Sequence, residues 1–472
     1  MALPDTVAAF FELEEHGTDV RTEVLAGLTT FLTMSYIVVV NPGILVGIEG
    51  EKPGIIVDAL SYGETVQAVA VVTIIAAFVA TITMALYANR PFAQAPGLGL
   101  NAFFAFTVIG ALGVAWQTAL AAVVVEGIIF LVLTLVGARR YIIEAFPAPV
   151  KFAVGAGIGA FLAIIGLQAM NVVVADPATY VTLGSVASDP VAILSVLGLF
   201  FTFALYARGV RGSILIGVVA TTVAGYAVAA SGLVTGESAQ ALRGNLNAGA
   251  NYDITPLAGA FIDGLGLVEP FSFALIVFTF FFVDFFDTAG TLTGVGQAAG
   301  FLDEKGDLPE IERPLLADAI GTTIGGMLGT STVTTYIESA TGVEEGGRTG
   351  LTALVVALLF LGSLVLVPLA AAIPLYASHI ALVVVAVIML GNLTDIDWDD
   401  VTQAVPAGMT VLIMPFTFNI GYGIAAGIIS YPVVKAAVGD WDEVGAAQWG
   451  LAAAFVVYFI VRTGGVLSGV GG

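Results

Sequence analysis

The feature that most constrains this chain is the length of its apolar runs. The stretch from Val66 to Tyr87, VQAVAVVTIIAAFVATITMALY, contains no charged residue. A helix of about 20 apolar residues crosses a bilayer core, and in lipid each segment must pair its own backbone N–H and C=O groups. In the whole chain 58% of residues are hydrophobic and 11% are charged, whereas a soluble protein carries about 25% charged residues. The sequence therefore predicts an all-α polytopic membrane protein.

The apolar runs divide the chain into two halves, which are joined by a polar linker that begins at Thr235. The runs fall at about 24–41, 66–88, 97–111, 116–137, 148–172, 191–207 and 213–231, and then at 271–290, 315–329, 335–346, 350–370, 376–391, 404–418 and 420–438. A last apolar run, WGLAAAFVVYFIV, either lies at the interface or adds a span. Most Lys and Arg residues fall on the cytoplasmic side if the N-terminus is inside. We therefore expect fourteen spans and a cytoplasmic N-terminus.

Two of these segments are short and interrupted. The third reads NRPFAQAPGLGLNAFFAF and the tenth reads TSTVTTYIESATGV, and each is third in its half. Corresponding broken segments in two halves are typical of inverted repeats and of a transporter's binding site. Lipid cannot pair the backbone groups that an unwound segment exposes, and STVTTY is rich in strand-forming residues. We therefore expect the two segments to pair as a short antiparallel ladder.

Three carboxylates lie in or beside these segments. Asp284 and Asp287 are three residues apart on one helical face of the eighth run, and Glu338 lies in the broken tenth segment. Ionisable groups inside spans cost at least about 2.5–3.5 kcal/mol and usually have a function. We expect a shared site, at which such a carboxylate can also exchange a proton. A structural role is the alternative: the Asp pair accepting bonds from neighbouring helices, and Glu338 capping its half-helix.

An amide and several aromatic side chains complete the candidate site. Asn101 offers both a hydrogen-bond donor and an acceptor, although it could instead cap or turn the third segment. The aromatic side chains near the broken segments are Phe103, Phe104, Phe285 and Phe286. Carboxylates accept bonds from N–H groups, half-helix N-termini supply donors, and aromatic rings stack on flat ligands. A flat heterocycle with polar edges fits this set, and Thr335 of the ladder is a further candidate for contact with it.

Two other acidic residues in the apolar runs have a simpler interpretation. Glu126 has no charged neighbour and no broken helix beside it, so an internal hydrogen bond is favoured over contact with a substrate. Asp318 lies near Arg313 at the expected cytoplasmic end of its run, where an interfacial ion pair is expected.

The composition also excludes several classes of function. The chain has no cysteine and two histidines, which leaves neither a thiolate metal site nor a nucleophile–base pair for a membrane enzyme. GLGLN lacks the preceding strand of a dinucleotide-binding motif. The formal net charge is -22, which argues against a nucleic-acid partner. Loops such as DEKGDLPEIE carry this acidity, and a host with a salty cytoplasm is our hypothesis for it, with merely acidic loops as the alternative.

Four long motifs together resemble one known family. They are TEVLAGLTTFLTMSYIVVVNPGIL in the first span, NRPFAQAPGLGLNAFFAF in the third, FFFVDFFDTAGTL in the eighth and TSTVTTYIESATGVEEGGRTGLTAL through the tenth. The chain resembles the purine nucleobase permeases of the AzgA-like branch of the nucleobase–ascorbate transporter superfamily, which carry hypoxanthine, guanine and adenine. The resemblance covers nearly the whole chain.

The resemblance implies a specific architecture of two inverted seven-span repeats. The implied core domain takes residues 1–137 with spans 1–4 and residues 270–372 with spans 8–11. The implied gate domain takes residues 138–234 with spans 5–7 and residues 373–472 with spans 12–14 and the C-terminal apolar helix. Residues 235–269 link the repeats. The short strands lie in segments 3 and 10, with the substrate between these two segments and beside span 8.

The resemblance also implies a function: a secondary transporter in the cell membrane that imports purine bases by proton symport with alternating access. No cofactor is implied apart from the proton. Asn101, Asp284, Asp287 and Glu338 match the family's polar positions, with Asp287 as the first choice for ligand contact because DTAG is similar to the superfamily's Glu-Ser-x-Gly motif. Asp284 is then a proton-carrying or helix-holding partner. A uracil- or xanthine-type permease is the alternative, followed by an anion exchanger of similar fold; the oligomeric state, a homodimer included, stays open.

Overall fold

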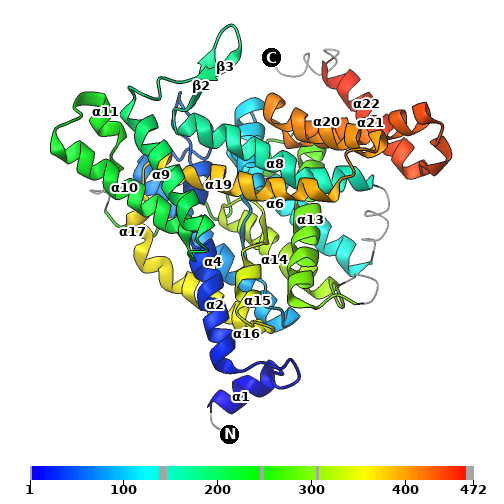
Figure 1. Ribbon diagram of the computed structural model, residues 1–472, viewed down its shortest axis with the longest axis horizontal. Helices are drawn as coiled ribbons and strands as arrows, with labels where there is room; N and C mark the ends of the chain where they lie inside the picture. The colour runs from blue at the N-terminus through cyan, green and yellow to red at the C-terminus, as the bar shows by residue number, and fades with distance from the viewer. Residues whose placement is uncertain (1–2, 138–145, 245–248, 269, 304–307, 464–472) are drawn as a thin grey trace. The chain divides into compact units, whose positions relative to one another are not determined.

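The computed structural model describes residues 3–137, 146–244, 249–268, 270–303 and 308–463. Contacts divide the chain into two compact units, Met1–Leu135 with Ile164–Val384 and Val136–Ala163 with Val385–Gly472. The predicted core and gate domains stay a prediction, and two of their boundaries, at 138 and 269, lie outside the described residues. Figure 1 labels most elements along the chain, from α1 in blue to α22 in red.

The first unit contains most of the helices. In its first segment lie α1 (Leu3–Phe10), α2 (Val20–Met34), α3 (Ile37–Leu45), α4 (Tyr62–Thr83), η1 (Met84–Ala88), α5 (Leu98–Ala102), η2 (Phe103–Ala111) and α6 (Trp116–Leu135). In its second segment lie α9 (Pro190–Ala207), α10 (Ser213–Ser231), α11 (Gly236–Ala241), α12 (Phe261–Leu265), α13 (Pro270–Ala299), α14 (Glu312–Leu328), α15 (Ser339–Glu344), α16 (Gly350–Gly362), η3 (Ser363–Leu366), α17 (Val367–Ala370) and α18 (Leu375–Ser378). Of these, η1 and η2 are π-helical.

The second unit is smaller. It contains η4 (Leu390–Asp395), α20 (Val401–Thr417), α21 (Ile420–Val438), η5 (Trp441–Glu443) and α22 (Ala446–Thr463). Two helices, α8 (Ala148–Ala169) and α19 (Ile380–Met389), run from one unit into the other. Phe161 of α8 packs edge-on against Phe418, with ring centroids 5.9 Å apart.

Among the described residues, ten helical segments are long and apolar enough to cross a membrane. They are α2–α3, α4–η1, α6, α8, α9, α10, α13, α16–α17, α18–η4 and α21. Shorter apolar helices cover Leu98–Ala111, Val401–Thr417 and Ala446–Ile460. The prediction of a mostly helical polytopic membrane protein is therefore confirmed.

Helices of the first unit approach one another closely where small residues meet. A Cβ atom added to Gly27 of α2 would stand 2.6 Å from the Cβ of Val355 in α16. Such crossings are typical of membrane proteins, in which van der Waals packing rather than the hydrophobic effect joins the helices. Buried Glu23 of α2 also accepts hydrogen bonds from the backbone of Arg348 (2.9 Å) and from the side chain of Thr352 (2.6 Å), at the start of α16. These contacts fix α2 against α16.

The predicted ladder between the two broken segments is present. Strand β1 (Gln94–Pro96) pairs antiparallel with β4 (Val333–Thr335), in the register Gln94↔Thr335, Ala95↔Thr334 and Pro96↔Val333. Helix α5 begins directly after β1, and α15 begins soon after β4. A separate β-hairpin, β2 (Val173–Asp176) with β3 (Tyr180–Leu183), was not predicted; Figure 1 shows it as a pair of green arrows.

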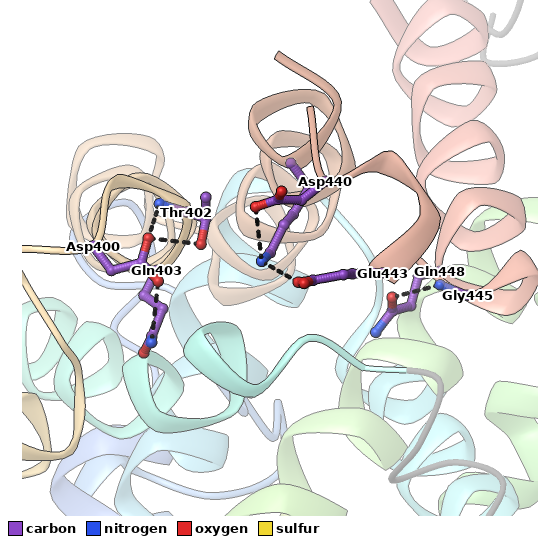
Figure 2. Close-up of polar contacts among 8 residues, drawn as sticks. Asp400, Thr402, Gln403, Asp440, Glu443, Gly445 and Gln448 are labelled. Atoms are coloured by element: carbon purple, nitrogen blue, oxygen red, sulfur yellow. Dashed lines mark hydrogen bonds and ion pairs between the residues drawn. The ribbon is translucent and has the colours of Figure 1, made fainter. Parts of the chain in front are cut away.

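Side-chain hydrogen bonds order the ends of helices in the second unit, as Figure 2 shows. Asp400 caps α20 by accepting bonds from the backbone N–H and the hydroxyl of Thr402, both at 2.8 Å. Lys435, in the last turn of α21, donates to Glu443 at 2.6 Å. Gly445 N donates to Gln448 Oε1 at 3.1 Å where α22 begins.

The capping role of Asp400 yields a stability prediction. The Thr402 hydroxyl, and next its backbone N–H, hold the pKa of Asp400 below its usual 3.8. Asp400→Ala should cost about 1 kcal/mol at pH 7, as loss of an N-cap does. Because the pKa is lower in the folded than in the unfolded chain, the cap stabilises above the unfolded pKa and its contribution is lost as the pH falls below it. The melting temperatures of wild type and variant should stay apart down to about pH 4 and converge only as the pH falls below the usual pKa of 3.8; Asp399→Ala is the matched control, and a constant gap would contradict the assignment.

Candidate functional site

The two half-helices that define the candidate site are tied together beyond the strand pairs themselves. Gly97 N donates to Thr332 O at 3.0 Å, and Tyr336 N donates to Ala93 O at 2.9 Å. The hydroxyl of Tyr336 also reaches Pro96 O at 2.6 Å. A Cβ atom at Gly97 would stand 2.6 Å from Thr334 Cγ2, so glycine is needed for this close approach. The backbone groups that membrane lipid could not satisfy are therefore paired across the ladder.

Asp287 and Glu338 come together beside this ladder. Helix α13 packs along β4 and α15, which places Asp287 where it interacts electrostatically with Glu338 and lies near Thr334. Tyr36, between α2 and α3, donates its hydroxyl proton to Glu338 Oε1 at 2.5 Å. Both carboxyl groups are half-buried rather than sealed. This pair, with Tyr36 behind it, can accept hydrogen bonds from the N–H groups of a ligand.

Asn101 lies deep between the broken segments. It is fully buried, and its side-chain oxygen accepts a hydrogen bond from Ser331. Its amide nitrogen donates to Pro96 O at 3.5 Å. Both ends of the amide therefore have partners within the two broken segments, as the structural alternative for this residue requires. Its contact with a substrate stays a prediction.

Phe103 and Thr335, two further candidates, point into the protein. Phe103 is 2% exposed and packs edge-on against Phe280, with ring centroids 4.9 Å apart. Thr335 is equally buried; its hydroxyl donates to Asp318 Oδ1 at 3.2 Å and accepts from Gln94 Nε2 at 3.1 Å. Both residues support the ladder and its half-helices in this conformation, and direct contact with a ligand stays a prediction for each.

The predicted ion pair between Asp318 and Arg313 is wrong. Asp318 is fully buried, and its Oδ1 atom accepts bonds from Gln94 Nε2 (2.9 Å) and from the hydroxyl of Thr288 (3.0 Å). Arg313 instead pairs with exposed Glu310 at 3.3 Å. The reason is the direction of α14, which begins at Glu312 and turns Asp318 toward β4. Gln94 and Asp318 thus form a polar contact on the inner side of the ladder.

Asp284 and Asp287 share one helix but not one environment. Asp284 is fully buried and lies within hydrogen-bond reach of Glu126. Its nearest hydroxyl, that of Thr322, is 3.5 Å from Oδ2. The internal hydrogen bond expected for Glu126 is present but long, at 3.4 Å from the hydroxyl of Thr332. Of the eighth-span pair, Asp287 is the member that interacts electrostatically with Glu338.

Two residues near the candidate site were missed by the sequence reasoning. Tyr36 lies in the TMSYIVVVNPG part of the first motif, and Gln94 in PFAQAP of the third. Each motif was used only as a family signature, so the polar side chain within it received no role. Within the described ranges, no group of three or more His, Cys, Asp or Glu residues is placed to hold a metal ion.

Comparison with known proteins identifies the family. A family model described as "Permease family" matches residues 21–426. The chain belongs to this permease family. The permease is 42% identical to the adenine permease AdeP of Escherichia coli, over 91% of this chain and 90% of that protein. It is 40% identical to the guanine/hypoxanthine permease PbuG of Bacillus subtilis, over 96% and 99%, and 43% identical to a putative permease of Methanocaldococcus jannaschii, over 97% and 99%. The resemblance seen in the four motifs is thus confirmed.

Solved structures with a similar fold belong to membrane transporters. The transmembrane domain of the cyanobacterial bicarbonate transporter BicA superposes with a TM-score of 0.58 at 15% identity, over 86% of the permease and 97% of that domain. At this identity the likeness concerns the fold alone. It is the family match and the similar permeases that make this protein a transporter and not an enzyme.

Proposed function

We propose that this permease imports purine nucleobases by proton symport. The observation that carries the proposal is the pairing of Asp287 and Glu338 beside the β1–β4 ladder, with Tyr36 bonded to Glu338. Similar proteins named as adenine and guanine/hypoxanthine permeases support the substrate class. The four polar positions Asn101, Asp284, Asp287 and Glu338 are those that the motifs predicted.

The chemistry of this pair suits a purine. Two half-buried carboxyl groups present acceptors to ring and exocyclic N–H groups, and the N-termini of two half-helices favour electron-rich ring atoms. Two neighbouring acids repel each other when both are ionised, which favours uptake of a proton by one of them. Binding a base and a proton together would follow from this arrangement. The proton is the only coupling ion in the proposal.

Fourteen spans in two inverted repeats would account for the ladder. Besides the ten long segments, α5–η2, α14, β4–α15 and α20 supply four shorter ones. Each half then contributes one strand from its third segment, as the sequence predicted. In this scheme the core carries the site, the gate faces it, the two move in alternating access, and the N-terminus is cytoplasmic.

Uptake measurements test the function directly. Cells that lack their own purine transporters and express the permease should accumulate labelled hypoxanthine, and unlabelled adenine or guanine should compete. A protonophore should abolish accumulation, whereas replacing sodium should not. Competition by uracil or xanthine alone would favour the alternative permease type, and accumulation that is insensitive to the protonophore would refute proton symport.

An anion exchanger is the weaker candidate. Its site would need net positive charge to hold an anion, whereas the ladder is flanked by Asp287, Glu338 and buried Asp318. The fold shared with BicA does not outweigh this charge. Exchange of labelled bicarbonate or chloride by the purified permease would reverse the conclusion.

A further inference from the structure

A second pair of acids lies inside the first unit, away from Asp287 and Glu338. Glu126 of α6 and Asp284 of α13 are both fully buried, and their carboxyl groups lie within hydrogen-bond reach of each other. An ionised carboxylate can only accept hydrogen bonds. Two ionised carboxylates therefore cannot bond to each other, and the contact requires a proton.

The hydrogen bonds around the pair are too few to support two charges. Glu126 Oε2 and Asp284 Oδ1 have no donor among the described residues. Thr322 stands 3.5 Å from Asp284 Oδ2, but its single hydroxyl hydrogen is already directed to Val333 O at 2.6 Å. In the part of the chain that the structure describes, the hydroxyl of Thr332 is the one donor to Glu126, at 3.4 Å. Buried charges without strong donors are expensive.

Buried aromatic rings and close helix packing surround the pair. Phe130, one turn after Glu126, packs against Phe285, with ring centroids 5.7 Å apart, and both rings are almost completely buried. On the other side, a Cβ at Gly127 would stand 2.6 Å from Thr323 Oγ1, so α6 and α14 are in direct backbone contact there.

We propose that Glu126 and Asp284 share a proton, and that this acid pair is a positioning element for the broken tenth segment. One carboxyl group is protonated and donates its O–H to the other, which supplies the hydrogen that the two unpartnered oxygen atoms lack. Glu126 is therefore a positioning residue and not a ligand contact. The proposal adds a role for Glu126 and Asp284 to the transport function inferred above, and its charge argument holds whether or not purines are the substrate.

The nearby charges favour keeping this proton. The acids that act electrostatically on the pair are Asp318 of α14 and Asp287 of α13. Asp318 Oδ1 accepts bonds from Gln94, Thr288 and Thr335, so it has more hydrogen-bond donors than either member of the pair. A negative Asp318 disfavours a second and third charge close by.

The acid pair reaches the ladder through two threonines. The hydroxyl of Thr332 donates a hydrogen bond to Glu126, and the carbonyl of Thr332 accepts one from the backbone N–H of Gly97. Thr322, beside Asp284, donates its hydroxyl hydrogen to the carbonyl of Val333 at the start of β4. Loss of the shared proton would leave two repelling charges between α6 and α13 and would disturb both attachments. Protonation of the pair thus maintains the strand that leads to Glu338.

Infrared difference spectroscopy tests the shared proton independently of transport. The spectrum of purified wild type minus Glu126→Gln at pH 7 should show a carbonyl stretching band of a protonated carboxylic acid, and this band should shift in deuterium oxide. Glu344→Gln, at an exposed position of α15, is the matched control and should give no such band. A difference spectrum that contains only ionised carboxylate bands would overturn the proposal.

Uptake separates the positioning role from simple loss of folding. Glu126→Gln should stay within about twofold of wild type because its amide N–H replaces the shared proton, whereas Glu126→Ala should fall at least about tenfold. Equal loss in both variants, with normal amounts in the membrane, would refute the role of hydrogen bonding at this position. If wild type carries no purine at all, the proposed function fails, while the infrared result still decides whether the proton is shared.

Discussion

Glu338→Gln is expected to abolish uptake of the purine while leaving the amount of permease in the membrane unchanged. The amide keeps the size of the side chain and can still accept the Tyr36 hydroxyl proton, which now reaches Glu338 Oε1 at 2.5 Å. It loses the negative charge and the ability to gain and release a proton. A hydrogen bond to a charged group is worth about 1.5–3 kcal/mol, so binding alone should weaken roughly 10- to 150-fold. Proton coupling should be lost as well.

The measurement is uptake of labelled hypoxanthine, together with the affinity of the purified variant for the base. Glu344→Gln is the matched control because Glu344 lies on the same short helix and is exposed. This control should transport normally. Proton-driven accumulation by Glu338→Gln at the wild-type rate would refute the assignment of Glu338 to both the ligand site and the coupling site.

Asp287→Asn is expected to eliminate uptake for a related but separate reason. Asp287 interacts electrostatically with Glu338 and lies near Thr334, so it contributes the second acceptor of the site and part of its negative charge. An asparagine presents an N–H group where a purine N–H should bind, which replaces attraction with two facing donors. We therefore expect loss of binding as well as of transport, measured by a ligand-induced shift of the melting temperature.

Asp263→Asn removes the same charge from an exposed position on α12 and serves as its control. It should bind and transport normally. If Asp287→Asn transports normally while Asp284→Asn does not bind the base, the roles of the two eighth-span acids are the reverse of those assigned here. Such a result would also place the ligand on the side of the acid pair.

Much of the architecture follows from local chemistry in the sequence. A β-branched run inside an apolar context has unpaired backbone groups that lipid cannot satisfy, and this predicted a partner for STVTTY in the other broken segment. The long apolar helices follow from hydropathy in the same way. The β2–β3 hairpin escaped prediction because its residues lie outside any span, where water can satisfy the backbone and no such constraint applies.

The side-chain partners in the site were harder to predict. The sequence predicts an ion pair between Asp318 and Arg313 because the two residues are close along the chain. Spacing along a helix shows on which face a residue lies, but it does not show which neighbouring element packs against that face. The same limit applies to Asp284 and Asp287. They share one face of α13, yet Asp284 belongs to the acid pair with Glu126 and Asp287 belongs to the candidate ligand site. Tyr36 joins Glu338 across 302 residues of sequence, and no local pattern in a single sequence reports such a contact.

The ladder between the two halves also has a consequence for biogenesis. Gln94 and Thr335, which meet at its end, are 241 residues apart, so ribosomes finish the first strand long before its partner exists. During that interval the polar backbone of β1 cannot be released into lipid and must be held by water or by the insertion machinery. Correct insertion of the first half is therefore completed only by synthesis of the second. A chain truncated before β4 should be retained by the insertion machinery and degraded, and supplying the second half as a separate polypeptide should rescue it.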